Sequence, residues 1–81
     1  MVLLPAPFHG ANVRTMKNAI GKKIRHRREE LGLSQYAVSA ATGISRAHIS
    51  RIEGGKNSPL FGTVERLAKA LRTSPASLLA A

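Results

Sequence analysis

Residues 33–56, which read LSQYAVSAATGISRAHISRIEGGK, decide the fold of this chain. They contain two short runs with helical spacing, separated by a turn at Gly43. Each run follows a serine, Ser34 or Ser45, whose hydroxyl oxygen can accept a backbone N–H that a helix N-terminus leaves unpaired. Gly43 and Gly54-Gly55 can end the runs in the left-handed conformation that glycine adopts at little cost. The pattern predicts two helices joined by a tight turn, over about residues 35–42 and 46–53.

Helical patterns continue on both sides of this stretch. Apolar residues recur at spacings of three, four and seven, and they predict helices over about 18–31 and 61–71. Ser74-Pro75 predicts a short helix over about 75–79. We therefore expect an all-α fold, a compact domain of five short helices at residues 18–81 with a flexible arm at residues 1–17. The expected inward-facing residues are Ile20, Ile24, Leu31, Val38, Ala41, Ile44, Ile49, Ile52, Phe61, Val64, Leu67, Ala68 and Leu71.

Composition limits the chemistry. The 81 residues suffice for one small domain, and they include no cysteine, which excludes disulfides and thiolate metal sites. His9, His26 and His48 lie far apart in the sequence, so we expect no metal and no other cofactor. Four acidic residues and no convergent set of nucleophile, base and acid indicate that the chain is not an enzyme.

The charge indicates a polyanionic partner. Lys and Arg number 13 against four Asp and Glu, which gives a net charge of +9, and seven of the basic residues precede the first acid. A solvated helix face is the usual explanation of such a run, but this excess favours nucleic acid or an anionic membrane. The basic first helix lacks the Trp- and Phe-rich face of membrane-surface helices. No long apolar run or signal peptide appears, so we expect a cytoplasmic protein without a membrane partner.

The helix predicted at 46–53 has the two faces that DNA recognition needs. Ile49 and Ile52 would bury one side, although any amphipathic surface helix also exposes a polar side. Arg46 and Arg51, on the other side, suit bidentate contact with guanine. The expected base-contacting residues are Ser45, Arg46, Ala47, His48, Ser50 and Arg51, and the expected phosphate-contacting residues are Gln35, Lys56 and Asn57. Arg28 and Glu53 form either a buried ion pair between two helices or two solvated charges.

Residues 20–79 resemble the lambda-repressor-like, or Xre-type, helix-turn-helix family. The resemblance rests on segments 20–25, 28–35, 43–46, 49–53 and 67–71, together with Gly55-Lys56, Pro59 and Leu78. It implies a five-helix DNA-binding domain that works as a dimer, with the same residues on bases and phosphates and with Arg28 and Glu53 as an internal ion pair. The chain departs from the family pattern at Arg27, Ser39, Leu60, Glu65 and Arg72-Thr73. Leu60, Leu78 and Leu79 belong to a dimer surface or to the core, or are exposed by chance.

These features predict a sequence-specific transcription regulator, most simply a repressor, that binds double-stranded operator DNA as a homodimer. Two alternatives stay open. One is an antitoxin that represses its own operon and binds a cognate toxin, which a neighbouring toxin gene would identify. The other is a protein-bridging module of the same fold, which would tolerate charge reversal at Arg46 and Arg51.

Overall fold

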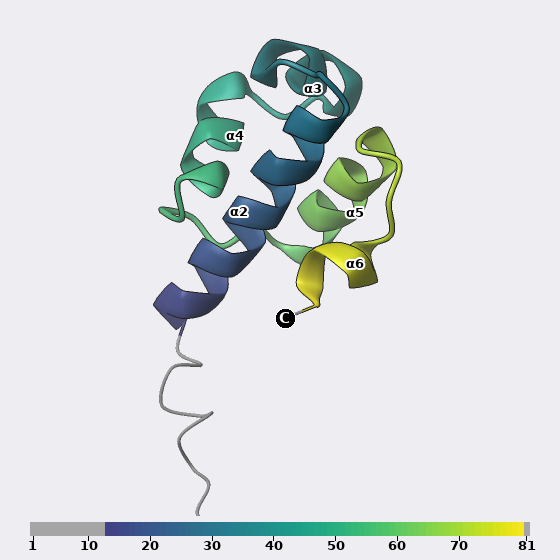
Figure 1. Cartoon of the computed structure of the whole chain (residues 1–81). Helices are drawn as coiled ribbons and strands as arrows, with labels where there is room; N and C mark the ends of the chain where they lie inside the picture. Colours follow the sequence, from purple (N-terminus) through teal and green to yellow (C-terminus); the bar gives the residue numbers. More distant parts are fainter. Residues whose placement is uncertain (1–12, 81) are drawn as a thin grey trace, which may run out of the picture.

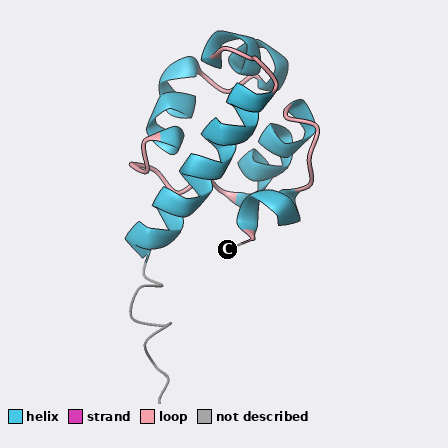
Figure 2. Cartoon of the chain, in the orientation of Figure 1, coloured by secondary structure: helices cyan, strands magenta, loops and turns pink. Residues whose placement is uncertain are grey.

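The computed structural model describes residues 13–80 of the chain, with side chains from residue 18 onward. These residues form five helices and no strand, which confirms the predicted all-α fold (Figures 1 and 2). The helices are α2 (Val13–Glu30), α3 (Gln35–Thr42), α4 (Arg46–Glu53), α5 (Phe61–Ala70) and α6 (Pro75–Leu79).

The first helix is longer than the sequence pattern predicted. It begins at Val13, five residues before the expected start, so the prediction of an arm was wrong for residues 13–17. Those residues include Arg, Met and Lys, which favour helix, and no glycine or proline interrupts them. The start was predicted from the position of the first apolar residue of the periodic pattern, and such a pattern does not mark helical residues that precede it. The rest of the predicted arm, residues 1–12, lies outside the described residues.

Helix α2 runs through the middle of the molecule, with α4 on one side and α5 and α6 on the other (Figure 1). The buried core gathers from all five helices and from the turn before α4. It consists of Ile20, Ile24, Val38, Ile44, Ile49, Ile52, Val64, Leu67, Ala68, Leu71 and Leu78, and Leu31 and Leu33 pack against it.

Two of the predicted inward-facing residues are exposed. Ala41 faces solvent, and the next residue, Thr42, is buried in its place. The Thr42 hydroxyl donates to Val38 O at 2.7 Å and accepts from Ile44 N at 3.1 Å, so burial leaves its polar atom paired. Phe61, the first residue of α5, is 57% exposed.

Helices α2 and α4 approach closely at Gly21. A methyl group on Gly21 would lie 3.0 Å from the carbonyl oxygen of Glu53 and closer still to that of Ile52. Both oxygens are backbone atoms in the last turn of α4, so neither can rotate away. Glycine at this position therefore sets the distance between the first helix and the end of α4.

Three helix ends use glycine in the left-handed conformation. Gly32, Gly43 and Gly55 have φ values of 69°, 78° and 75°, and they follow α2, α3 and α4. Arg72 takes the same conformation after α5, with φ 55°. Its N–H donates to Lys69 O, and the next N–H donates from Thr73 to Ala68 O at 2.9 Å, the pair of bonds that usually accompanies a glycine cap.

Arg27 closes the end of α5 from the other side. Its Nε donates to Leu71 O at 2.9 Å, and its Nη2 donates to Arg72 O at 3.2 Å. A cation suits this place because a helix C-terminus carries partial negative charge. The arginine that departs from the family pattern on the first helix thus holds the irregular end of α5.

Substituting Gly21 by alanine should destabilise the domain. Forcing a methyl group against fixed backbone typically costs about 1–3 kcal/mol of unfolding free energy. Urea unfolding followed by far-UV circular dichroism measures the change. Gly62→Ala is the matched control, because its methyl group meets nothing within 4 Å and should leave the domain as stable or slightly more stable. Equal effects of the two changes would contradict the close approach of α2 and α4.

Replacing Arg72 by glycine should stabilise the domain, because the left-handed conformation costs a residue with a Cβ roughly 1–2 kcal/mol. Part of this gain is offset by the larger chain entropy that glycine loses on folding. The net gain should be about 1 kcal/mol in the same unfolding experiment. Arg72→Ala removes the same charge and keeps a Cβ, so it should give no gain. If alanine stabilised as much as glycine, charge rather than backbone conformation would be the cause.

Candidate nucleic-acid interface

Helix α4 is anchored on one side and open on the other. Ile49 and Ile52 are fully buried, and the Ser45 hydroxyl caps the helix by accepting from His48 N at 3.1 Å. His48 itself is half-buried beside them. The outward side is exposed and consists of Arg46, Ala47, Ser50 and Arg51. This arrangement leaves a short helix with two arginines and small residues between them, which a groove in a polyanion can accept.

The turn between α3 and α4 is fixed by side chains. Ser39 Oγ donates to Ile44 O at 2.5 Å, and Ile44 itself is buried. The serine that departs from the family pattern therefore holds the residue just before α4. Together with the cap at Ser45, this bond sets the direction in which α4 starts.

A buried ion pair fixes the other end of α4. Arg28 Nε and Nη2 donate to the two carboxylate oxygens of Glu53 at 2.7 and 2.9 Å, in a bidentate pair. The Arg28 side chain is 12% exposed and the Glu53 side chain 4%. A third donor, Arg28 Nη1, bonds Leu33 O at 2.8 Å. The hydrogen bonds with Glu53 raise the pKa of Arg28 above its ordinary value, so the guanidinium stays charged at any pH at which the domain is studied.

Gln35 connects this ion pair to the exposed face of α4. Its Nε2 donates to Glu53 Oε1 at 3.1 Å, and its Oε1 accepts from Arg46 Nη1 at 3.2 Å. The sequence pattern placed Gln35 on a phosphate and gave no sign of this bridge. The amide keeps one N–H that neither of these bonds uses.

Tyr36 is one of the residues at this interface that sequence reasoning missed. The guanidinium carbon of Arg46 lies over the Tyr36 ring, 5.1 Å from its centroid. Tyr36 as a residue is 71% exposed and takes no part in the core. The signal in the sequence was its position directly after Gln35, but no spacing rule links it to Arg46.

A groove brings together two of the three predicted phosphate-contacting residues, Lys56 and Asn57, while Gln35 lies outside it. It has a volume of about 310 Å³ and lies between α4, the loop after it and the start of α5. Lys56 and Asn57 line it beside His48, and so do Ser58 and Thr63, whose hydroxyls the sequence pattern did not single out. Pro59 and Leu60 complete it, and Leu60, the N-cap residue of α5, makes no side-chain capping bond. The first N–H groups of α5 are therefore free of a capping side chain.

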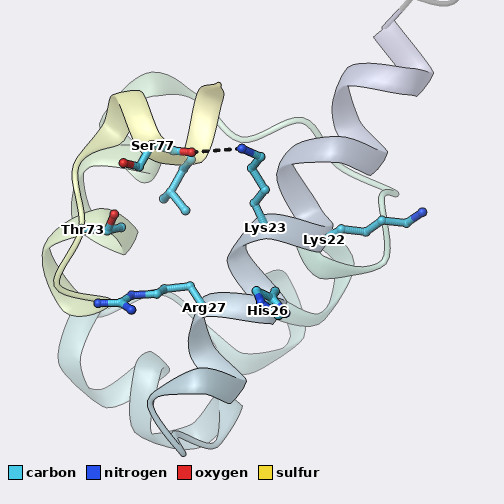
Figure 3. Close-up of a pocket in the computed structure, with 7 residues that line it drawn as sticks. Lys22, Lys23, His26, Arg27, Thr73 and Ser77 are labelled. Carbon is cyan, nitrogen blue, oxygen red and sulfur yellow. Dashed lines mark hydrogen bonds between the residues drawn. The ribbon is translucent and has the colours of Figure 1, made fainter. Parts of the chain in front are cut away.

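A second groove lies on the other side of α2, against α6 (Figure 3). It has a volume of about 500 Å³, and basic side chains of α2 border it. Three of them already have partners: Lys23 donates to Ser77 O at 3.4 Å, Arg27 bonds the end of α5, and His26 lies 3.4 Å from Glu30. The remaining lining residues are Lys22, Thr73, Ser77 and Leu78. We take this groove to be the seam along which α6 is attached to α2.

Two further searches cover the described residues alone. No group of three or more His, Cys, Asp and Glu side chains there could hold a metal ion. None of the helices described has the length and apolarity needed to cross a membrane.

Comparison with known proteins finds one kind of domain throughout. The profile of a family described as a helix-turn-helix domain matches residues 19–81. An HTH-type transcriptional regulator of Sinorhizobium fredii, y4dJ, itself uncharacterized, is 34% identical over 64 residues, which are 79% of this chain and 83% of that protein.

Solved structures give the same result. The P22 c2 repressor protein, in complex with a synthetic operator, is 36% identical with a TM-score of 0.71, over 75% of this chain and 92% of that one. The restriction-modification controller protein C.AhdI of Aeromonas hydrophila is 27% identical with a TM-score of 0.74, over 76% and 94%. An HTH_3 family transcriptional regulator of Vibrio cholerae is 30% identical with a TM-score of 0.80 over 85% of this chain. This chain spans only 39% of that last protein.

Breaking the buried ion pair should be costly. Glu53→Gln leaves the Arg28 charge enclosed without its counter-charge, a change that typically costs about 3–5 kcal/mol of unfolding free energy. Glu29→Gln is the matched control, because Glu29 pairs with Arg25 on the surface, and its loss should change stability by less than about 1 kcal/mol. Chemical unfolding of both variants measures the difference. Similar losses would mean that burial adds nothing to the Arg28–Glu53 pair.

Proposed function

Because this chain belongs to the lambda-repressor-like helix-turn-helix family of DNA-binding transcriptional regulators, we propose that it represses transcription by inserting α4 into the major groove of operator DNA. The observation that carries the proposal is the outward face of α4. Its exposed residues include two arginines and no carboxylate, while the opposite side is fully buried. The similar P22 c2 repressor protein has been solved in complex with a synthetic operator, which supports DNA binding by this chain.

The residues of α4 divide by what they can contact. Arg46 and Arg51 suit the O6 and N7 acceptors of guanine, and the methyl group of Ala47 suits that of thymine. Ser50 lies between them and can donate to or accept from a base edge. Ser45 and His48 lie at the margin, because the Ser45 hydroxyl already caps the helix and His48 faces the neighbouring groove.

The groove after α4 suits a backbone phosphate. Lys56 supplies a charge, and Asn57, Ser58 and Thr63 supply polar groups at the same opening. The uncapped start of α5 adds backbone N–H groups and the positive end of a helix dipole. The remaining amide N–H of Gln35 suits a second phosphate, at the start of α3. A net charge of +9 supplies the general attraction on which such contacts build.

A homodimer would place two such surfaces on half-sites about 34 Å apart, one helical turn of DNA. Leu78 is buried in the core and is therefore not available for a dimer surface. Leu60, Phe61 and Leu79 are exposed apolar residues at the start of α5 and the end of α6, and we propose that they contribute to the dimer surface. Light scattering of the protein with and without a two-half-site duplex tests the dimer.

Base contacts and phosphate contacts should respond differently to substitution. On a duplex selected from a random pool, Arg51→Ala should weaken binding by roughly 5- to 150-fold, the equivalent of about 1–3 kcal/mol, and affect random duplexes little. Lys56→Ala should weaken binding to both duplexes alike and lower the slope of log affinity against log salt by about 1. Titration of labelled duplexes at several salt concentrations measures both.

Lys69→Ala is the control for charge, because this exposed lysine lies in the last turn of α5. It should leave binding to the selected duplex nearly unchanged. If Arg51→Ala bound with unchanged sequence preference, α4 would not be the element that contacts the bases. If the unsubstituted protein enriched no sequence from the pool, sequence-specific binding itself would be refuted.

A further inference from the structure

We infer that Tyr36 is a positioning residue for DNA recognition: its ring holds the guanidinium of Arg46 in the orientation that meets the groove. The inference rests on the proposed function and adds to it a residue outside α4. It concerns the one tyrosine of the chain, which contributes nothing to the core and is 71% exposed.

Arg46 stands where a basic residue is unfavourable. It is the first residue of α4, directly after the cap Ser45, and the first turn contains no acid. The N-terminus of a helix carries partial positive charge, so a cation there is repelled rather than stabilised. A helix built for stability alone would carry an acidic residue at this place. Residues that break a local rule of this kind concentrate at functional sites.

Two groups of α3 offset the repulsion. Gln35 Oε1 accepts from Arg46 Nη1 at 3.2 Å, and the electron-rich face of the Tyr36 ring lies under the guanidinium at 5.1 Å from Cζ to the ring centroid. Both present negative partial charge to the cation, one at its edge and one at its face. Because Gln35 is itself bonded to the buried Glu53, the edge contact is tied to the fixed end of α4.

The ring does what the hydrogen bond alone does not. A single hydrogen bond lets the guanidinium swing about it, whereas a second contact, with its central carbon over the Tyr36 ring, limits that motion. Arginine has five N–H donors, and the contact with Gln35 uses one, so donors remain on the edge away from Gln35. Side-chain order established before binding lowers the entropy lost on binding, and arginine has many rotamers to lose.

The inference makes Tyr36 act through Arg46, and a double-mutant cycle tests this directly. The variants are Tyr36→Leu, which keeps apolar bulk and loses the aromatic face, Tyr36→Phe, which keeps the face and loses the hydroxyl, Arg46→Ala, and Tyr36→Leu combined with Arg46→Ala. Each is titrated against the duplex that the unsubstituted protein selects from a random pool, and against a random duplex of equal length.

Tyr36→Leu should weaken binding to the selected duplex about 2- to 5-fold, the equivalent of an exposed cation–π contact, and leave binding to the random duplex unchanged. Tyr36→Phe should bind like the unsubstituted protein. In the Arg46→Ala background, Tyr36→Leu should cause no further loss. Equal losses in Tyr36→Leu and Tyr36→Phe would overturn the inference, because they would assign the effect to a contact of the hydroxyl with DNA. Independent losses in the cycle would overturn it as well.

Nuclear magnetic resonance of the DNA-free protein supplies a readout that DNA does not affect. The ring current of Tyr36 should move the side-chain proton signals of Arg46 upfield in the unsubstituted protein and in Tyr36→Phe, and not in Tyr36→Leu. Unshifted Arg46 signals would overturn the inference. A protein that selects no sequence at all would refute the proposed function, whereas a selective protein that Tyr36→Leu leaves unchanged would refute only the role of Tyr36.

Discussion

The rest of the structure depends on the carboxylate of Glu53, which is enclosed at the end of α4 and must be fully paired. A buried charge without partners costs several kcal/mol, so the elements around it are placed by the need to reach it. Arg28 reaches it from α2 with two bonds, and Gln35 reaches it from the start of α3. Arg28 also bonds Leu33 O, which fixes the loop between α2 and α3. One carboxylate thus joins the first helix to both helices of the helix-turn-helix.

Helix α2 packs against α4 on one side and α6 on the other, and α3 and α5 complete the domain (Figure 1). Gly21 lets α4 approach α2 on one side, and Arg27 holds the end of α5 on the other. Both features are local exceptions, a glycine inside a helix and a charge where an apolar residue is usual. Each is explained by backbone carbonyl groups of a neighbouring element. Gly21 allows the carbonyl groups of α4 to come close, and Arg27 donates hydrogen bonds to those at the end of α5.

The hydrogen bonds around Glu53 extend to the exposed face of α4, on which the proposed function depends. From Glu53 the contacts run through Gln35 to Arg46, and Tyr36 supports Arg46 from below. In this arrangement the stability of the fold and the orientation of Arg46, which we propose to face DNA, have a common origin. The unfavourable position of Arg46 at a helix N-terminus is what separates this surface from an ordinary solvated helix face, because stability gives no reason for it.

The sequence by itself determined the elements and their inner faces. Serine caps, left-handed glycines and apolar spacing act over a few residues, so α3, α4, α5 and α6 appear where the pattern predicts them and Ile49 and Ile52 face inward. The family resemblance also paired Arg28 with Glu53. Local patterns failed at three places. Thr42 is buried in place of Ala41, and Phe61 is exposed although the spacing predicts it inside. Residues 13–17 extend α2 although no apolar periodicity in the sequence predicts a helix there.

Only the tertiary structure decided the contacts between residues far apart in the chain. Arg27 meets the end of α5 across more than forty residues, Gln35 bridges Glu53 and Arg46, and Tyr36 lies under Arg46. No spacing rule connects such pairs, because side-chain hydrogen bonds and ring contacts depend on where two elements cross. The sequence therefore determined which helix faces outward and which residues it carries. The packing of three helices around one buried carboxylate decided how those residues are held.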